Sequence, residues 1–303
     1  MKKVDEEKVG EPERQRGGKD EGAEAETVAV DVHTTDSEIS GELLSMPRGT
    51  AFGTMVHDVL EHCDFRVPSL ESEVRSVIER RHGEEPGGSE SSALARGLSA
   101  VLQTPLDGLV DGFRLADLGQ SERLDEFEFH LLLADGRRRV SLGRLAADAA
   151  ENESGHVQSY FASLAGTWQS SEASGLLYGS IDAFLRFGNR YFVVDYKTNA
   201  LHPRERGARI ADYSMGRMSE EMGRHGYYLQ ALIYTVAAHR YLKTRLRGYD
   251  PAVNLGGAGY LFVRAMVGPG TPVVNGVRCG VHSWRPSLAT IEAVDQLLDG
   301  DMP

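Results

Sequence analysis

Residues 175–198 read GLLYGSIDAFLRFGNRYFVVDYKT, two apolar segments separated by Gly188-Asn189. A glycine-containing pair between two such segments is a strong signal for the tight turn of a β-hairpin. Asp195 and Lys197 are two residues apart on the second strand, so their side chains point to the same face of the sheet. Asp182 lies on the first strand, and the short turn brings it close to Asp195. This stretch therefore predicts a hairpin that gathers two carboxylates and an ammonium group.

The charged side chains of this hairpin are those that metal-dependent phosphodiester hydrolysis requires. Two carboxylates can hold Mg²⁺, which prefers oxygen ligands in octahedral geometry and keeps several waters. A neighbouring lysine can orient or help to deprotonate the attacking water, and can offset charge on the phosphate. Charged residues on a strand are often simply solvated, but Asp195 directly follows Tyr-Phe-Val-Val. A charge in so apolar a strand is costly unless it is ion-paired or bound to metal, and the residues alone leave both interpretations open.

The rest of the chain mixes helical and extended patterns. Apolar residues recur with helical period in TAFGTMVHDVLEHCDF, and RLDEFEFHLLL alternates before it turns apolar, as a strand does. We therefore expect an α/β fold, a central mixed β-sheet flanked by helices. The expected strands cover residues 123–133, which lead into a turn at 135–136, and residues 175–187, 190–198 and 259–267. The expected helices cover residues 50–65, 227–246 and 287–298, with shorter helical pieces at 94–102 and 109–113.

Two further polar pairs are placed where they could serve the same site. Gln230 and Tyr234 are four residues apart on an expected helix and share one face. They are either a partly buried polar pair or a contact to the phosphate backbone of a nucleic acid. Glu126 and Glu128 alternate with phenylalanines on an expected strand and also share one face, so either could supply a third carboxylate.

The net charge of −12 is unevenly distributed. Residues 1–45 contain six Lys/Arg and thirteen Asp/Glu, whereas the remaining 258 residues contain 27 and 32. The first segment is polar and almost lacks aromatic residues, so it cannot bury enough apolar area to offset its ordering entropy. We expect a disordered acidic linker or tail over residues 1–45 and a folded domain over residues 46–303. Because nucleic-acid-binding proteins usually carry a basic surface, we expect weak unaided binding to DNA.

Composition also argues against several classes of protein. No segment approaches 18 consecutive apolar residues, so no transmembrane helix is expected, and no apolar stretch follows the two N-terminal lysines as in a secretory signal. The two cysteines, Cys63 and Cys279, cannot alone supply a four-thiolate zinc or iron–sulfur site. We expect them to be free thiols of a cytoplasmic protein. The phosphate-binding loop of helicases, G-x-x-x-x-G-K-[ST], is missing from the sequence.

Several spaced motifs together resemble one known family. They are GSID and VVDYKTN in the hairpin, the FGTMVH helix, RLDEFEF, the QALIY segment, YDPAVNLGGAGYLFVR and GVHSWRP. In this order they resemble the C-terminal nuclease domain of RecB-type helicase–nucleases, which carries the PD-(D/E)XK type of motif. The resemblance runs from about Gly49 to the last expected helix. It implies a restriction-endonuclease-like core.

The family's functional residues can be carried over to the matching positions. The resemblance implies one or two Mg²⁺ ions held by four ligands, namely His57, Asp182, Asp195 and the carbonyl of Tyr196. It also implies that Lys197 is the catalytic lysine. Glu126 best matches the family's acidic strand residue, with Glu128 as a close competitor. Gln230 and Tyr234 match the Q-x-x-x-Y motif that contacts DNA.

The resemblance also implies a function and a set of partners. The expected activity is that of a DNA nuclease of the exodeoxyribonuclease V type, acting on single- and double-stranded ends in double-strand break repair and recombination. The expected partners are DNA, the helicase portion of RecB, RecC- and RecD-like subunits, and RecA as a further candidate. Without helicase motifs, the chain would be a fragment of a longer protein or would work beside a separate helicase. The alternative is a non-catalytic module that docks DNA or a recombinase.

Overall fold

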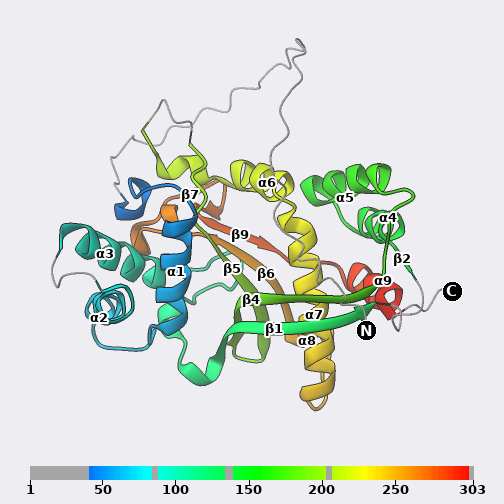
Figure 1. Cartoon of the computed structure of the whole chain (residues 1–303), viewed down its shortest axis with the longest axis horizontal. Helices are drawn as coiled ribbons and strands as arrows, with labels where there is room; N and C mark the ends of the chain where they lie inside the picture. The colour runs from blue at the N-terminus through cyan, green and yellow to red at the C-terminus, as the bar shows by residue number, and fades with distance from the viewer. Residues whose placement is uncertain (1–40, 84–87, 134–138, 203–206, 300–303) are drawn as a thin grey trace, which may run out of the picture. The chain divides into compact units, whose positions relative to one another are not determined.

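The computed structural model describes residues 41–83, 88–133, 139–202 and 207–299. Within this part of the chain a five-stranded mixed sheet lies between two groups of helices (Figure 1). Strands β5 and β6 are parallel, and the other neighbouring strands are antiparallel. The strands, in their order across the sheet, are β1 (Arg123–Leu133), β4 (Gly175–Phe187), β5 (Arg190–Lys197), β6 (Leu255–Phe262) and β9 (Val281–Trp284). The structure thus confirms the predicted α/β class.

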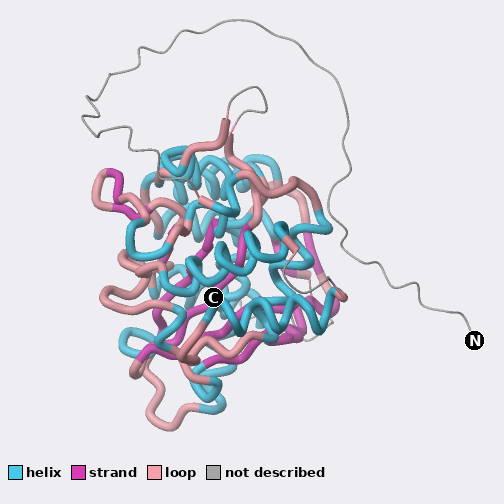
Figure 2. Tube along the Cα trace, turned by 90° about the vertical axis from the view of Figure 1, so that its left-hand side faces the viewer, coloured by secondary structure: helices cyan, strands magenta, loops and turns pink. Residues whose placement is uncertain are grey.

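Each face of the sheet has its own hydrophobic core, and Figure 2 shows the strands lying among the helices that cover them. One core is formed with α1 (Thr50–His62), α2 (Leu70–His82) and α3 (Ser89–Gln103). The other is formed with α4 (Leu142–Asn152), α5 (Gly155–Thr167), α6 (Met215–Arg224), α7 (Tyr227–Arg245) and α9 (Leu288–Asp299). A short helix, α8, covers Pro251–Asn254. Two small antiparallel pairs of strands lie outside the main sheet. They are β2 (Val140–Ser141) with β3 (Glu172–Ala173), and β7 (Val273–Val274) with β8 (Val277–Arg278).

The hairpin that the sequence predicts is formed by β4 and β5. Phe187 pairs with Arg190 across the turn, and the antiparallel register continues to Ala183 opposite Val194. Gly188 adopts a φ of 62°, a left-handed conformation that glycine reaches without the strain of a Cβ atom. Beyond the hairpin, the last residues of β5 pair only with β6, whose eight residues are all buried. The hairpin therefore leads directly into the centre of the sheet.

Most of the other predicted elements are present, with two differences. The helix expected over residues 109–113 is wrong, because Gly108 and Gly112 adopt positive φ values of 92° and 76° and the chain turns there instead. The strand expected over residues 259–267 is β6, which begins and ends earlier and continues into a 3-10 helix at Val263–Ala265. The turn expected at residues 135–136 lies outside the described residues.

The folded part begins slightly before the expected boundary at residue 46. Leu43 and Leu44 lie on a 3-10 helix (Glu42–Leu44) and are buried, 2% and 7% exposed. The expected acidic tail otherwise lies outside the described residues. Both cysteines are free, as expected, and the structure shows that both are buried. Among the described helices, none has the length and apolar character needed to cross a membrane.

Candidate active site

The candidate site lies where helix α1 meets the β4–β5 hairpin (Figure 1). The backbone N–H of Tyr196 donates a 2.8 Å hydrogen bond to the Oδ2 atom of Asp182. The carbonyl oxygen of Tyr196 accepts a 2.8 Å hydrogen bond from Nε2 of His57. The other ring nitrogen of His57, Nδ1, lies 3.4 Å from Oδ2 of Asp182. Three potential metal ligands from three different elements thus meet at one point.

Glu126 joins this group from strand β1. Among the described residues, the ligating atoms of His57, Glu126 and Asp182 all lie within 4.8 Å of one another. The carboxylate of Glu126 is exposed and accepts a 2.7 Å hydrogen bond from the hydroxyl of Ser180 on β4. Glu128, its competitor in the sequence, is not part of this group. The geometry therefore favours Glu126 as the third acid.

The backbone is irregular at Glu126. This residue has a φ of 46°, which is unusual for a residue with a Cβ atom and costs on the order of 1 kcal/mol. The β1–β4 register includes Asp125 opposite Ala183 and Phe127 opposite Ile181, and the pair between them is interrupted. The irregularity also changes the direction of side chains on β4, because Ile181 and Ala183 contribute to opposite cores. It therefore coincides with the point where Glu126 and Asp182 face each other.

Asp195 and Lys197 lie deeper, at the end of strand β5. Asp195 is 3% exposed, and its Oδ1 atom lies 2.7 Å from Nζ of Lys197. This oxygen makes no hydrogen bond of regular geometry to the described residues. The Lys197 ammonium is covered on another side by the ring of Tyr227, whose centroid lies 3.9 Å from Nζ. The buried charges are therefore paired, as a low-dielectric environment requires.

The electrostatics of the site raise the pKa values of Asp195, His57 and Lys197. Burial raises the pKa of the Asp195 carboxyl, and the nearby Asp182 carboxylate raises it further. Burial opposes protonation of His57 and of Lys197, but neighbouring carboxylates outweigh this effect. The carboxylate of Asp182 raises the pKa of His57, and that of Asp195 raises the pKa of Lys197. Lys197 is therefore a stable cation when no metal is bound.

A buried arginine, Arg264, joins the helix that carries His57 to the end of strand β5. It is 1% exposed, and its guanidinium group lies over the ring of Phe52 on α1, 4.6 Å from the centroid. Its N–H groups donate to four backbone carbonyls, those of Thr198, Leu43, Met46 and Pro47. The first of these residues directly follows Lys197, and the other three precede α1. Arg264 thereby fixes the two halves of the site relative to each other.

Gln230 and Tyr234 lie on helix α7 near the deep end of the site. The amide of Gln230 donates a 2.9 Å hydrogen bond to the Tyr234 hydroxyl and accepts one of 2.9 Å from the Tyr260 hydroxyl. Burial raises the pKa of Tyr234, and the negative charge of Asp195 raises it further. The pair is thus part of a half-buried network within electrostatic range of the carboxylates. Its hydrogen bonds show that Gln230 orients Tyr234.

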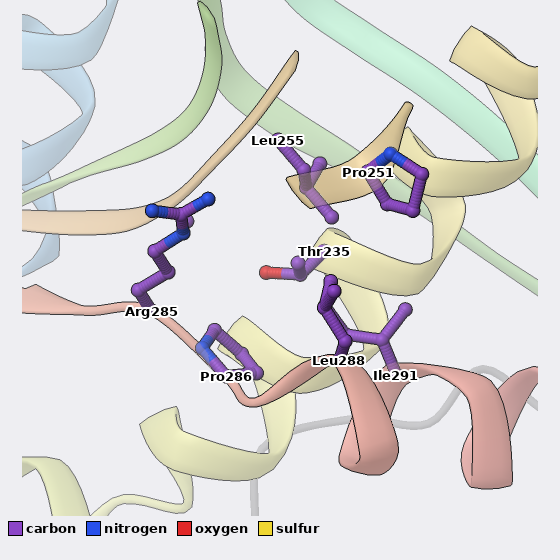
Figure 3. A pocket seen from close by; sticks show the side chains of 8 residues that line it. Thr235, Pro251, Leu255, Arg285, Pro286, Leu288 and Ile291 are labelled. Atoms are coloured by element: carbon purple, nitrogen blue, oxygen red, sulfur yellow. The ribbon is translucent and has the colours of Figure 1, made fainter. Parts of the chain in front are cut away.

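Other features of the molecule are less suited to be the site. A hollow of about 10 Å³ lies between α7, α8, β6 and α9, and its lining is mostly apolar (Figure 3). At that size it holds one water molecule at most. A second group of potential ligands, Asp58, Glu61 and His62, lies on α1. Asp58 is already paired with Arg81 and His82, so this group is explained as a surface ion-pair network.

The comparison with known families agrees with this geometry. Residues 42–302 match the sequence profile of the PD-(D/E)XK nuclease superfamily. The chain belongs to this superfamily. That Asp182 is the first acid of the superfamily's motif, and Asp195-Tyr196-Lys197 its second part, stays a prediction from the sequence.

Several relatives of the chain share one name. The chain is 37% identical over 287 residues to the RecBCD enzyme subunit RecB of Mycolicibacterium smegmatis, covering 92% of this chain and 26% of that protein. It is 38% identical over 294 residues to the protein of that name from Mycobacterium tuberculosis, covering 91% and 26%. With the Escherichia coli protein of that name it shares 31% identity over 257 residues, covering 84% and 19%. The chain thus spans about a quarter or less of these relatives' length.

The donors of the site fit a divalent cation of the kind that PD-(D/E)XK nucleases use. Carboxylate and carbonyl oxygens are the ligands that Mg²⁺ prefers, and an imidazole nitrogen completes the set. Beyond its ion pair with Lys197, the Oδ1 atom of Asp195 makes no hydrogen bond of regular geometry to the described residues, so it can accept a cation as a further partner. The fit rests on residues from α1, β1, β4 and β5.

Two groups that shape the site were missed by the sequence interpretation. In the sequence, nothing distinguishes Arg264 from any other residue that follows an apolar strand. The carbonyl groups that it binds lie more than 60 residues away in the chain. Tyr227 carried a usable signal, because it lies three residues before Gln230 and shares the helix face of Gln230 and Tyr234.

The strain at Glu126 can be measured by comparing two substitutions. Glu126→Ala and Glu126→Gly both remove the carboxylate, but only glycine relieves the left-handed backbone. We predict that the Gly variant is more stable than the Ala variant by about 1 kcal/mol in urea denaturation. Equal stabilities, or a more stable Ala variant, would show that the backbone there is unstrained.

The affinity of the site for Mg²⁺ is expected to depend on pH. Metal ligands must be deprotonated, and the pKa values of Asp195 and His57 are both raised, so protons compete with the metal at higher pH than at ordinary residues. We predict that Mg²⁺ affinity, measured by isothermal titration calorimetry, falls as pH is lowered from about 8 to 6, by up to about tenfold per pH unit for each proton displaced. Asp58→Asn, a change in the surface network, should leave this dependence intact. An affinity that is constant over this range would contradict the assignment of these ligands.

Proposed function

We propose that this chain is a Mg²⁺-dependent DNA nuclease that hydrolyses phosphodiester bonds as the nuclease part of a RecBCD-type helicase–nuclease. One observation carries the proposal: His57 on α1 and Asp182 on β4 are in contact, and the end of β5 brings Asp195 and Lys197 within electrostatic range of them. Membership of the PD-(D/E)XK superfamily supports a nuclease, and the names of the relatives support the RecBCD type. The biological process would be the repair of double-strand breaks and recombination.

We infer that the cation is held by His57, Asp182, Asp195 and the carbonyl of Tyr196. Bound there, Mg²⁺ would neutralise charge on the scissile phosphate and lower the pKa of a water. Asp182 is oriented for this role by the N–H of Tyr196, and His57 by contacts at both ring nitrogens. Glu126 adds a carboxylate at the exposed side of the site, where it would orient a water or help to hold a second ion.

Lys197 acts in this proposal as a fixed positive charge. Its raised pKa keeps the side chain protonated at neutral pH, which supports charge stabilisation rather than proton abstraction. A preorganised cation stabilises the negative charge that develops on a phosphate during hydrolysis more effectively in a partly dry site than in water. The side chain of Lys197 is only 13% exposed, so its ammonium group lies in such a partly dry environment.

The substrate would be a DNA end, single- or double-stranded, delivered by a helicase portion and RecC- or RecD-like subunits. Gln230 and Tyr234 would contact the phosphate backbone, and the effect of the Asp195 charge on the pKa of Tyr234 supports a position near the carboxylates. The net charge of −12 gives little general attraction to DNA, so unaided binding should be weak and sensitive to salt. Delivery by other parts of such a complex would compensate for this.

A module that only docked DNA or a recombinase would not need the buried pair of Asp195 and Lys197. Burying two charges costs more free energy than an apolar pair of similar size. Their retention together with Asp182 and His57 supports the catalytic role over docking alone.

Nuclease activity can be tested with linear single- and double-stranded DNA at low salt. We predict Mg²⁺-dependent degradation by the wild-type protein, and its loss in Asp195→Ala together with a loss of Mg²⁺ binding. Lys197→Ala should keep Mg²⁺ binding, because none of the four proposed ligands is changed, but cleave at least about 100-fold more slowly, because the stabilising charge is lost.

The matched control is Lys243→Ala, because Lys243 is exposed on helix α7 and 65% accessible to solvent. It should cleave DNA like the wild type. Degradation that is equal in wild type and Asp195→Ala would refute the proposed function. A Lys197→Ala variant that also loses Mg²⁺ would make this lysine a structural group instead.

A further inference from the structure

The ammonium group of Lys197 lies against an aromatic surface. Its Nζ atom is 3.9 Å from the ring centroid of Tyr227 and 5.4 Å from that of Tyr260. Both distances are within the range in which a ring face attracts a cation, and the shorter one is close to optimal. The attraction is strengthened here because the lysine side chain is only 13% exposed.

The ring of Tyr227 is itself held firmly. It stacks on Tyr260 with a centroid distance of 5.8 Å and an interplanar angle of 28°, and on His225 with 5.4 Å and 21°. Its hydroxyl accepts a hydrogen bond of 3.4 Å from the side-chain amide of Asn199. A ring fixed by two stacking neighbours presents the same face to Lys197 whatever else enters the site.

The contact with the ring of Tyr227 differs from an ion pair in what it does to the charge of Lys197. A lysine has a long, flexible side chain, and its ion pair with Asp195 holds only one side of the ammonium group. A second carboxylate would hold the other side but would also neutralise the charge that must act on phosphate. An aromatic face holds the ammonium group while leaving its net charge unchanged and its remaining N–H groups able to donate.

We propose that Tyr227 is a positioning residue for Lys197, and that the electron-rich face of its ring holds the ammonium group in place for phosphodiester hydrolysis. The inference rests on the proposed nuclease function. Tyr227 also lies on the same face of α7 as Gln230 and Tyr234, so the three residues form one row along the helix. Helix α7 would then supply both the orientation of the lysine and the contact to DNA.

The experiment replaces Tyr227 by phenylalanine and then by phenylalanines that carry one, two or three fluorine atoms. Fluorine withdraws electron density from the ring face with little change in shape, so it weakens attraction to a cation while packing is retained. We expect Tyr227→Phe to cleave DNA within about twofold of wild type. Across the fluorinated series kcat should then fall stepwise by roughly tenfold in total, while KM and Mg²⁺ affinity stay constant.

The matched control is the same series at Tyr241, which lies on the same helix but contacts Phe127 and Phe184. It should leave kcat unchanged. A kcat that does not vary with fluorination at residue 227, in a protein that cleaves DNA, would overturn the inference alone. Inactivity of Tyr227→Phe would also overturn it, because the hydroxyl rather than the ring would then be required.

A second measurement does not depend on activity. Protons of a lysine side chain beside a ring face are shifted upfield in NMR spectra by the ring current. We expect such a shift for the Lys197 methylene groups in wild type and Tyr227→Phe, and a clearly smaller one in Tyr227→Leu, where only the more distant ring of Tyr260 remains. Absence of the shift in wild type would place the ammonium group away from the ring and contradict the inference. A wild-type protein without Mg²⁺-dependent cleavage would instead defeat the proposed function.

Discussion

Burial of the Asp195 carboxylate at the end of strand β5 constrains the architecture around it. A charged group that is 3% exposed requires compensation, and breaking a buried ion pair typically costs roughly 3–5 kcal/mol. Lys197 supplies the opposite charge, and its own burial is offset by the aromatic face on its other side. Strand β6 and helix α7, which carry the two rings nearest to the ammonium group, are therefore needed for the stability of the site as well as for its shape.

The same end of β5 is where segments far apart in the sequence have to meet. His57 arrives on α1, Glu126 on β1 and Asp182 on β4, and their ligating atoms gather within 4.8 Å of one another. Arg264 binds carbonyl groups on both sides of this junction, before α1 and after β5. The described hydrogen bonds of Arg264 all go to neutral carbonyl oxygens. Burying a cation without an opposite charge costs free energy. This cost is offset by its structural role, because Arg264 holds helix α1, which carries His57, against the end of strand β5.

Much of this could be predicted from the sequence where the signal was local. The two apolar segments and the turn at Gly188 predicted the β4–β5 hairpin with nearly correct ends, and spacing predicted that Asp195 and Lys197 share one face. The unusual φ of Glu126 has no counterpart in the residue pattern, since it arises from pairing with β4. The partners of Arg264 lie too far away in the chain to be inferred. The roles of the individual site residues remain predictions.

The central claim is that His57, Asp182, Asp195 and the Tyr196 carbonyl form one metal site. It is tested most directly by growing crystals with Mn²⁺ and locating the ion from its anomalous scattering. We expect an anomalous peak among these four groups, and its loss in crystals of Asp195→Ala. A peak confined to the surface group of Asp58, Glu61 and His62, with none at the hairpin, would contradict it.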